Sequence, residues 1–370
     1  MWNRLPRCGR GTVGAMEIED IPTPALVLNV DALERNLRRM ADDCRAAGVA
    51  LRPHTKTHKS PWVARRQLRL GAAGVCAAKV GEAEVLVQAG IEDVLITTDL
   101  VPATMERALD LAGLARVTVV LDSVAMAREL GARAGRRGVE LDVLLDLHVG
   151  QQRTGVDPGP AAVAVATAIA EAPGLRLAGL QAYEGHCQLV PDPEEQRRRA
   201  FASYELMAAG RREIEAAGLR LPWVTTAGTG TYRLAIEHGM ATEVQPGSYV
   251  VMDTQYARVR PARFENAMFV LSSVVSTNRE GRAVVDAGWK ALSSDGGAPA
   301  VRDRPEATYE FAGDEHGRVQ GLGAVGAGER VWLVPSHCDT TINLHDGYVL
   351  VGDDGRVVGT LPVAARGRSA

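Results

Sequence analysis

The densest group of polar residues in the sequence is the run Arg52-Pro53-His54-Thr55-Lys56-Thr57-His58-Lys59. It follows a short apolar segment, 49–52, that is predicted to form a β-strand. Lysines and histidines in one loop can supply a nucleophilic amine and a group that transfers protons. A solvated basic loop has the same composition, so the run indicates an active site only if a chemical partner lies elsewhere in the chain.

The turn Ala227-Gly228-Thr229-Gly230-Thr231 is such a partner. It follows Thr226, at the end of another predicted strand, and precedes a helical pattern. Glycines let backbone N–H groups approach an anion closely, and threonine hydroxyls and a helix N-terminus add further donors. Gly228, Thr229 and Gly230 therefore form a candidate phosphate site, although such turns are also common for conformational reasons alone.

A lysine at one strand end and a phosphate-binding turn at another suit an aldehyde cofactor with a phosphate tail. Pyridoxal 5'-phosphate is such a cofactor, and it acts as an electron sink for bonds at the substrate α-carbon. Spacing does not decide between Lys56 and Lys59, but the scaffold should fix Lys56 better because it lies nearer the strand end. Lys56 is therefore the predicted Schiff-base lysine.

Other polar residues at predicted strand ends are candidates for the same site. His186 is a candidate general base, although many histidines have only a structural role. Arg153 could bind the cofactor's phenolic oxygen or be an ordinary surface guanidinium, and Tyr183 could line the ring pocket or simply be packed. The full set of candidate cofactor contacts is Lys56, Arg153, Gln181, Tyr183, Thr226, Gly228, Thr229, Gly230 and Tyr256.

A candidate metal pair lies late in the chain, in the segment Pro335-Ser336-His337-Cys338-Asp339. On a strand, residues i and i+2 share a face, so His337 and Asp339 are expected to project together while Cys338 points away. An imidazole with a carboxylate suits Mn²⁺, with Mg²⁺ or Zn²⁺ as alternatives, and leaves positions open for water and substrate. A surface histidine beside a capping aspartate is the simpler interpretation.

Eight short apolar runs separated by helical patterns must position these residues. This alternation indicates βα units on a parallel sheet, and the regular spacing favours a (β/α)8 TIM-like barrel over an open doubly wound sheet. Active sites of such barrels lie at the carboxyl ends of the strands. The runs are 49–52, 74–78, 94–98, 117–122, 141–147, 177–182, 223–226 and 243–251.

A chain of 370 residues is expected to hold two domains. Residues 21–255 are predicted to form the barrel, and period-2 patterns predict a second, antiparallel β domain at 256–363. The segment 21–30 is a candidate strand that could pair with this second domain. Residues 1–20 are expected to be a disordered extension, with Met16 as an alternative start to Met1, and 364–370 a frayed tail.

Bulk composition argues for a small-molecule substrate. The chain is 46% hydrophobic and 24% charged with a formal charge of −3, and its basic residues are dispersed, which gives no surface for nucleic acid or anionic lipid. Five widely spaced cysteines favour reduced thiols in a cytoplasmic protein. No apolar run is long enough to cross a bilayer.

These motifs resemble those of D-threonine aldolase and D-serine dehydratase, which are alanine racemase-like, fold type III pyridoxal-phosphate enzymes. The resemblance covers about residues 21–351 and implies a homodimer. In the aldolases the metal pair is a His and an Asp two residues apart, whereas the dehydratases have a Cys in the second position; Asp339 therefore favours an aldolase. The matching segments are 51–59, 153–155, 183–186, 227–231, 252–253 and 337–339.

The resemblance implies retro-aldol cleavage of a D-β-hydroxy amino acid, such as D-threonine, to glycine and an aldehyde. Lys56 would carry the cofactor, the metal would act on the β-hydroxyl, and His186 would remove its proton. Dehydration of D-serine or 3-hydroxy-D-aspartate and a 3-hydroxy-D-aspartate aldolase activity remain alternatives. A non-catalytic pyridoxal-phosphate carrier is a further alternative, but such carriers generally consist of the barrel alone.

Overall fold

The computed structural model describes residues 17–259 and 263–370. Their contacts divide the chain into two compact units. The barrel unit comprises Met40–Gly247 with Gly367–Ala370, and the β unit comprises the residues up to Arg39 with Ser248–Arg366. The expectations of a disordered extension and of a start at Met16 lie, for residues 1–16, outside the described residues.

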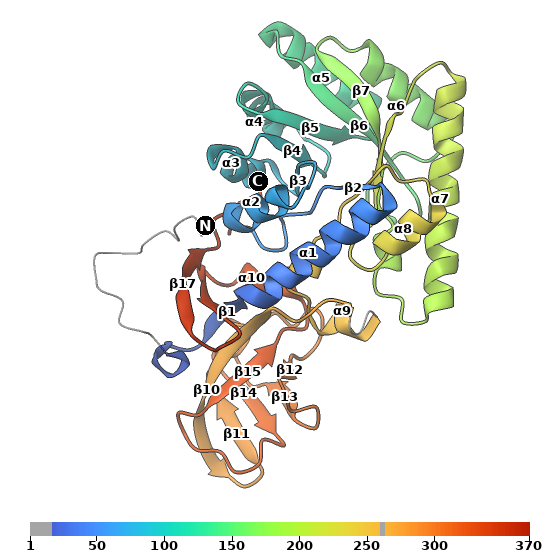
Figure 1. Ribbon diagram of the computed structural model, residues 1–370. Helices are drawn as coiled ribbons and strands as arrows, with labels where there is room; N and C mark the ends of the chain where they lie inside the picture. Colours follow the sequence, from blue (N-terminus) through green and yellow to red (C-terminus); the bar gives the residue numbers. More distant parts are fainter. Residues whose placement is uncertain (1–16, 260–262) are drawn as a thin grey trace. The chain divides into compact units, whose positions relative to one another are not determined.

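The barrel unit is built on eight parallel strands in the order β2-β9-β8-β7-β6-β5-β4-β3. Figure 1 labels β2 to β7 of this unit. The two ends of this order are joined because His54 forms a parallel bridge with Cys76 and the Thr55 N–H donates to the Cys76 carbonyl over 2.9 Å. The TIM-like barrel is therefore confirmed. The strands are β2 (Ala50–Leu51), β3 (Val75–Ala77), β4 (Asp93–Ile96), β5 (Arg116–Leu121), β6 (Leu141–Leu147), β7 (Leu175–Ala182), β8 (Trp223–Thr226) and β9 (Glu243–Val244).

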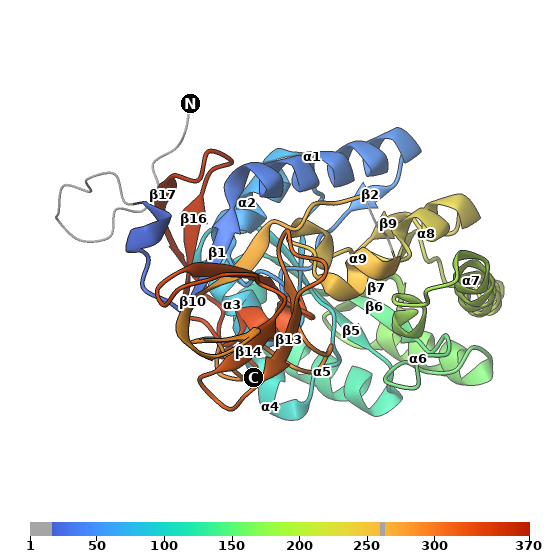
Figure 2. The same ribbon diagram turned by 90° about the horizontal axis from the view of Figure 1, so that it is seen from below.

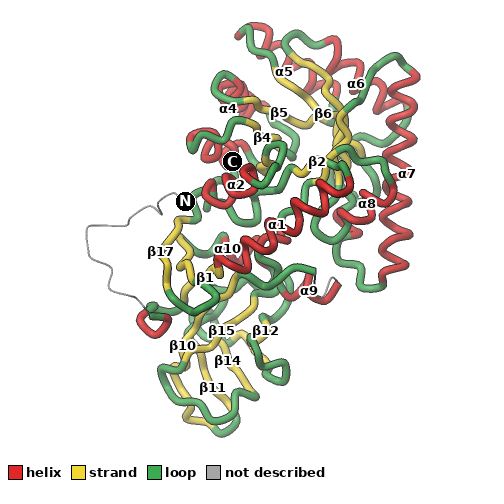
Figure 3. The backbone as a smooth tube through the Cα atoms, in the orientation of Figure 1, coloured by secondary structure: helices red, strands yellow, loops and turns green. Residues whose placement is uncertain are grey.

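Helices follow the barrel strands and surround them (Figures 2 and 3). Four of these helices have proline in the first turn, where its missing N–H has no intrahelical partner to lose. The helices are α2 (Pro61–Arg69), α3 (Val80–Gln88), α4 (Pro102–Ala112), α5 (Val124–Arg137), α6 (Pro160–Glu171), α7 (Pro193–Ala216) and α8 (Tyr232–His238), with α1 (Val30–Ala47) linking the two units.

The last predicted barrel strand, 243–251, is wrong beyond Val244. Pro246 has no N–H to donate to a ladder, and the chain instead forms a 3-10 helix at Ser248–Val250. Strand β9 therefore ends at Val244.

The β unit contains a mixed sheet with one parallel pair among its described strands. β1 (Ala25–Asn29) pairs antiparallel with β10 and parallel with β16, so the predicted antiparallel domain also receives an N-terminal strand. The other strands are β10 (Met268–Arg279), β11 (Arg282–Val285), β12 (Ala300–Val301), β13 (Thr308–Phe311), β14 (Gly317–Gln320), β15 (Arg330–Val334), β16 (Gly347–Val351) and β17 (Val357–Pro362). Two short helices, α9 (Thr254–Val259) and α10 (Cys338–Ile342), belong to the same unit.

The predictions of a disordered N-terminal extension and a frayed C-terminal tail are both wrong for the residues that the structure describes. Ile18–Asp20 forms a 3-10 helix, and Ile18 packs against the buried cluster around Ile21, so this segment is part of the fold. In the predicted frayed tail, the Ala370 carbonyl accepts a hydrogen bond of 2.9 Å from the Gly81 N–H. This approach requires a glycine, because a Cβ at position 81 would lie 2.6 Å from the same oxygen.

Within the described ranges, 17–259 and 263–370, we find no helix with the length and apolar character needed to span a bilayer.

Candidate active site

The two lysines of the loop after β2 have different surroundings. The Lys59 ammonium lies 2.6 Å from the Glu82 carboxylate, and these side chains are only 9% and 5% exposed. The Lys56 amine is partly exposed and has no hydrogen-bond or ion-pair partner among the described residues. The ion pair holds Lys59 against Glu82 of α3. This supports Lys56 as the amine that is free to react.

His54 orders the backbone that carries Lys56. Its Nδ1 accepts a hydrogen bond from the Lys56 backbone N–H (3.4 Å), so its Nε2–H donates to Thr97 Oγ1 over 3.0 Å. Burial and the charges of Lys56 and Arg153 hold the pKa of His54 well below its usual value. The imidazole that accepts from the Lys56 backbone is therefore neutral. The sequence placed His54 in the right loop but did not single it out.

A buried carboxylate lies beneath the glycine–threonine turn. Glu184 accepts hydrogen bonds from Thr226 Oγ1 (2.9 Å), Thr231 Oγ1 (2.5 Å) and the Tyr204 hydroxyl (3.0 Å). These donors hold both ends of the turn against the segment that follows β7. Sequence analysis missed Glu184, although it lies between the candidates Tyr183 and His186.

Gln188 holds the middle of the same turn. Its Oε1 accepts from the Gly230 N–H over 2.9 Å, and its Nε2 donates to Thr231 Oγ1 over 2.7 Å. A Cβ at Gly228 would lie 2.6 Å from Gln188 Oε1, so close packing on Gln188 explains the glycine. Because α8 has only seven residues, the turn itself, and not a long helix dipole, would have to bind an anion.

Gln181 belongs to a hydrogen-bond network between strand ends. Its amide donates to the Thr97 carbonyl (3.2 Å) and to Asp146 Oδ1 (3.0 Å), and its Oε1 accepts from Gln245 (3.3 Å). Both amide hydrogens are thus engaged within the barrel, which favours a role in positioning the strand ends over direct donation to a ligand.

Three carboxyl groups lie at the carboxyl ends of the neighbouring strands β4, β5 and β6. Burial, together with Asp146 and Asp122, raises the pKa of Asp99 to about 7, and burial raises the pKa of Asp146 to about 6. Thr154 donates to Asp146 and the Gly155 N–H donates to Asp122, which fixes the loop that carries Arg153. Sequence analysis missed all three carboxyls, because single aspartates at strand ends are too common to be informative.

Arg153 and Tyr183 come together from different loops. The Arg153 guanidinium carbon lies 5.4 Å from the centre of the Tyr183 ring, in a cation–π contact. The structure thus joins two of the predicted cofactor contacts, at the carboxyl ends of β6 and β7.

His186 lies in a 3-10 turn, Gly185–Cys187, against the loop after β6. A Cβ at Gly150, whose φ is +114°, would lie 3.1 Å from His186 Cε1. Burial lowers the pKa of His186, so its imidazole is neutral at neutral pH and able to accept a proton.

In the β unit, His337 and Asp339 do not lie on a strand, so the face-sharing argument for them is wrong. β15 ends at Val334, and His337 is the N-cap of α10, which contains Asp339 in its first turn. Pro335 interrupts the ladder, which explains why the strand ends early. Cys338 is completely buried, but it does not point away from the candidate pair as predicted, because its thiol lies 3.4 Å from Asp339 Oδ1.

Asp295, which sequence analysis missed, orients His337. Its Oδ2 lies 2.5 Å from His337 Nδ1, and its Oδ1 accepts from Ser293 and Thr340. Burial opposes the ionised form, but the hydrogen bonds from Ser293 and His337 lower the pKa of Asp295. A carboxylate bound at Nδ1 leaves the Nε2 lone pair for a metal, an arrangement common in metal sites.

Asp253 connects the starts of the two short helices of the β unit. Its Oδ1 accepts from the Tyr256 backbone N–H (2.9 Å) and its Oδ2 from the Cys338 N–H (3.0 Å). Tyr256 is thus placed in α9 of the β unit. In the part of the chain that the structure describes, no three His, Cys, Asp or Glu side chains form a cluster able to hold a metal.

Two family models match consecutive parts of the chain. The alanine racemase N-terminal domain matches residues 28–255, and a putative serine dehydratase domain matches 267–351. The chain belongs to the alanine racemase-like, fold type III pyridoxal-phosphate enzymes. Its group comprises D-threonine aldolase, 3-hydroxy-D-aspartate aldolase and D-serine dehydratase, which confirms the resemblance inferred from the motifs.

The relatives are similar over nearly their whole length. The 3-hydroxy-D-aspartate aldolase of Paracoccus denitrificans (strain Pd 1222) is 40% identical over 95% of this chain and 94% of its own. The crystal structure of D-threonine aldolase from Filomicrobium marinum has a TM-score of 0.94 at 44% identity, covering 96% and 98% of the two chains. A D-threo-3-hydroxyaspartate dehydratase mutant, solved in a metal-free form, has a TM-score of 0.86 at 28% identity, covering 94% and 99%. The lyase described here therefore acts on carbon–carbon bonds.

The barrel unit fits the pyridoxal phosphate that this family implies. Lys56 offers an amine without an internal partner, and the adjacent Thr57 Oγ1 is buried without a hydrogen-bond partner among the described residues. Thr229 places a hydroxyl group in the buried turn, and Thr226 lies directly before it at the end of β8, with its hydroxyl donating to Glu184. This set matches an aldehyde with a phosphate tail.

Replacing Gly150 by Ala should displace the His186 ring of the lyase. The displaced imidazole would be better solvated, so its lowered pKa should rise towards the usual value, as measured by NMR titration. The control is Gly218→Ala, because Gly218 also has positive φ (+89°) but nothing within 4 Å of an added Cβ. Both variants should lose about 1 kcal/mol of stability from backbone strain. An unchanged His186 pKa in Gly150→Ala would contradict the contact.

Proposed function

We propose that the protein is a pyridoxal-phosphate- and divalent-metal-dependent aldolase that cleaves D-β-hydroxy amino acids of the D-threonine type to glycine and an aldehyde. The observation that carries the proposal is the separation of the two loop lysines, with Lys59 held by Glu82 and Lys56 left with its amine unpaired. The similarity to two aldolases at 40% and 44% identity supports the same reaction class.

The barrel residues would bind and orient the cofactor and substrate. Pyridoxal phosphate, when bound, supplies an electron sink for a bond that breaks at the substrate α-carbon. Lys56 would hold its aldehyde, and Thr226, Gly228, Thr229 and Gly230 its phosphate. Arg153 and Tyr183 would contact the ring, with Gln181 fixing the strand ends and Tyr256 as a further candidate contact.

His186 would take the proton of the substrate β-hydroxyl. The Cα–Cβ bond breaks, the hydroxyl carbon leaves as the aldehyde, and the α-carbon takes up a proton to give glycine. Because burial lowers the pKa of His186, its basic form persists below the usual titration range of histidine. The cleavage rate that depends on this base should fall only as the pH drops through that lowered pKa.

His337 and Asp339 would hold the metal, with Asp295 fixing the imidazole through Nδ1. Imidazole and carboxylate form a harder donor set than a site with a thiolate, which favours Mn²⁺, with Mg²⁺ or Zn²⁺ as alternatives. A metal at this position supplies Lewis acidity that lowers the pKa of a bound hydroxyl group.

Dehydration is the main alternative, since a relative 28% identical is a dehydratase. The resemblance associates dehydratases with a cysteine in place of Asp339. The neighbouring Cys338 does not replace it, because its side chain is buried and burial raises its thiol pKa well above the usual value. Aldol cleavage of 3-hydroxy-D-aspartate remains equally compatible with the residues. The presence of a second unit argues against a protein that only carries the cofactor.

We also propose that the protein is a cytoplasmic homodimer.

Product analysis tests the reaction directly. With Mn²⁺, D-threonine should give glycine and acetaldehyde in equal amounts, measured by chromatography and by reduction of the aldehyde. Parallel reactions with 3-hydroxy-D-aspartate and D-serine separate the alternatives. Formation of a keto acid and ammonia in place of glycine would assign the protein to the dehydratases.

Lys56→Ala should abolish the visible absorbance that the cofactor gains when it is covalently linked to a lysine. Lys79→Ala, which removes an exposed lysine at the start of α3, serves as the control and should keep the spectrum. An unchanged spectrum in Lys56→Ala would move the assignment to another lysine.

Asp295→Asn should weaken metal binding about 10- to 100-fold, as expected when a partner that orients a ligating histidine is lost. The affinity can be measured by titrating apoprotein with Mn²⁺ in an electron paramagnetic resonance assay. Asp346→Asn, at an exposed carboxylate of the same unit, is the control. Equal affinities for the two variants would contradict the role given to Asp295.

A further inference from the structure

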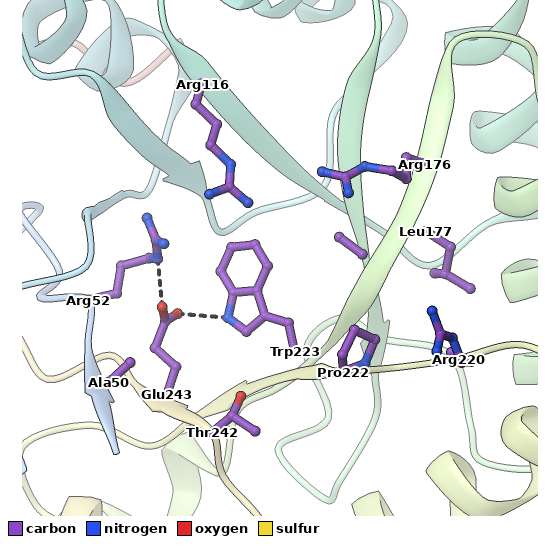
Figure 4. A pocket seen from close by; sticks show the side chains of 11 residues that line it. Ala50, Arg52, Arg116, Arg176, Leu177, Arg220, Pro222, Trp223, Thr242 and Glu243 are labelled. Atoms are coloured by element: carbon purple, nitrogen blue, oxygen red, sulfur yellow. Dashed lines mark hydrogen bonds and ion pairs between the residues drawn. The ribbon is translucent and has the colours of Figure 1, made fainter. Parts of the chain in front are cut away.

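A second pocket of the barrel unit lies at the opposite edge of the sheet from Lys56. It has a volume of about 630 Å³ and is lined by residues at or next to the starts of β5, β7, β8 and β9, together with Ala50 and Arg52 on either side of Leu51 in the short strand β2 (Figure 4). Parallel strands place their starts together at one edge and their ends at the other, so this pocket is distinct from the candidate active site. Four arginines line it: Arg52, Arg116, Arg176 and Arg220.

One side of the pocket is a fixed, buried group. Arg52 Nε donates to Glu243 Oε2 over 2.9 Å, and Trp223 Nε1 donates to Glu243 Oε1 over 3.1 Å (Figure 4). The Arg52 guanidinium carbon also lies 4.9 Å from the centre of the Trp223 ring. Both Glu243 oxygens are engaged, and Arg52, which also pairs with Asp93 at 2.5 Å, offsets part of its charge, so this carboxylate would oppose an anion less than a free one.

The other arginines keep donors available. Arg116 makes only long contacts, 3.4 Å to Asp93 and 3.3 Å to Asp142, and Arg176 lies 2.5 Å from Asp142. Their side chains are 54% and 71% exposed. Arg220 has no ion pair or hydrogen bond with any described residue. Since each guanidinium has five N–H donors, most donors of these three residues remain unused.

The charges around the pocket do not cancel. Four guanidinium groups face three carboxylates, namely Glu243, Asp93 and Asp142, so one positive charge is in excess. Figure 4 shows the Arg116 and Arg176 side chains extending from their strand starts towards the side on which Trp223 lies. The indole and Leu177 supply apolar surface, which strengthens interactions between charges.

We propose that this pocket binds a small polyvalent oxyanion bearing carboxylate or phosphate groups, at a site separate from the aldolase chemistry. Guanidinium forks match both groups bidentately, and the volume lies within the usual range for ligand pockets, about 300–1,000 Å³. Ion pairs at this end of a barrel also serve stability. That role explains the contacts of Asp93 and Asp142, but it leaves Arg220 unexplained.

Calorimetric titration of the holoenzyme with pyrophosphate and with citrate, at constant ionic strength set by chloride, tests the proposal. Holoenzyme is used because its phosphate turn already holds the cofactor. Arg220→Gln should weaken binding about tenfold, as should Arg176→Gln, because each removes charge-assisted hydrogen bonds. Arg211→Gln, which alters an arginine paired with Glu215 on α7, is the control and should bind as the unaltered protein does.

Tighter binding of pyrophosphate than of citrate supports a phosphate ligand, and the reverse supports a polycarboxylate. Arg220 has no partner to lose, so its variant should fold even if Arg176→Gln does not. The proposal is wrong if neither anion binds more tightly than chloride, or if Arg211→Gln weakens binding as much as Arg220→Gln. The cleavage assay is independent of these titrations, so failure of one proposal leaves the other standing.

Discussion

Lys59 and Glu82 form an ion pair from which water is almost excluded, and this pair organises the loop on which the proposed chemistry depends. Removing one partner of a buried ion pair leaves the other charge without compensation, which lowers the free energy of unfolding by about 3–5 kcal/mol. Glu82 also accepts from the Ala78 N–H, so the pair fixes the loop after β2 to the start of α3. Because Lys59 is held in this pair, Lys56 is the lysine of the loop that we propose as the Schiff-base residue.

The remaining site residues depend on buried polar groups that are satisfied from within the barrel. Glu184 and Gln188 hold the glycine–threonine turn, and Gln181 joins the ends of several strands. A buried polar group that lost its hydrogen-bond partner would destabilise the fold by about 1–3 kcal/mol, so these groups resist rearrangement. The barrel thus presents a rigid edge, which is what precise placement of a cofactor requires.

The two edges of the barrel use charge differently. At the carboxyl ends of the strands, burial and the neighbouring Asp146 and Asp122 raise the pKa of Asp99 to about 7, and burial lowers the pKa of His54, so these two groups favour their uncharged forms more than usual. At the opposite edge, arginines and carboxylates remain ionised in pairs around Trp223. The first environment suits proton transfer, whereas the second suits the recognition of an anion.

The sequence by itself determined the barrel, the loop of Lys56 and the turn at Gly228, because alternating apolar runs and glycine-rich turns are local patterns. Tertiary structure decided which side chains meet. Asp295 lies 42 residues before His337, and no local pattern links them. Pro246 ended a strand that the apolar pattern extended too far, since hydrophobicity does not report a missing N–H. Periodicity depends on residues that are neighbours in the sequence, so it can be predicted from the sequence alone. Hydrogen bonds between distant segments form only when those segments pack together.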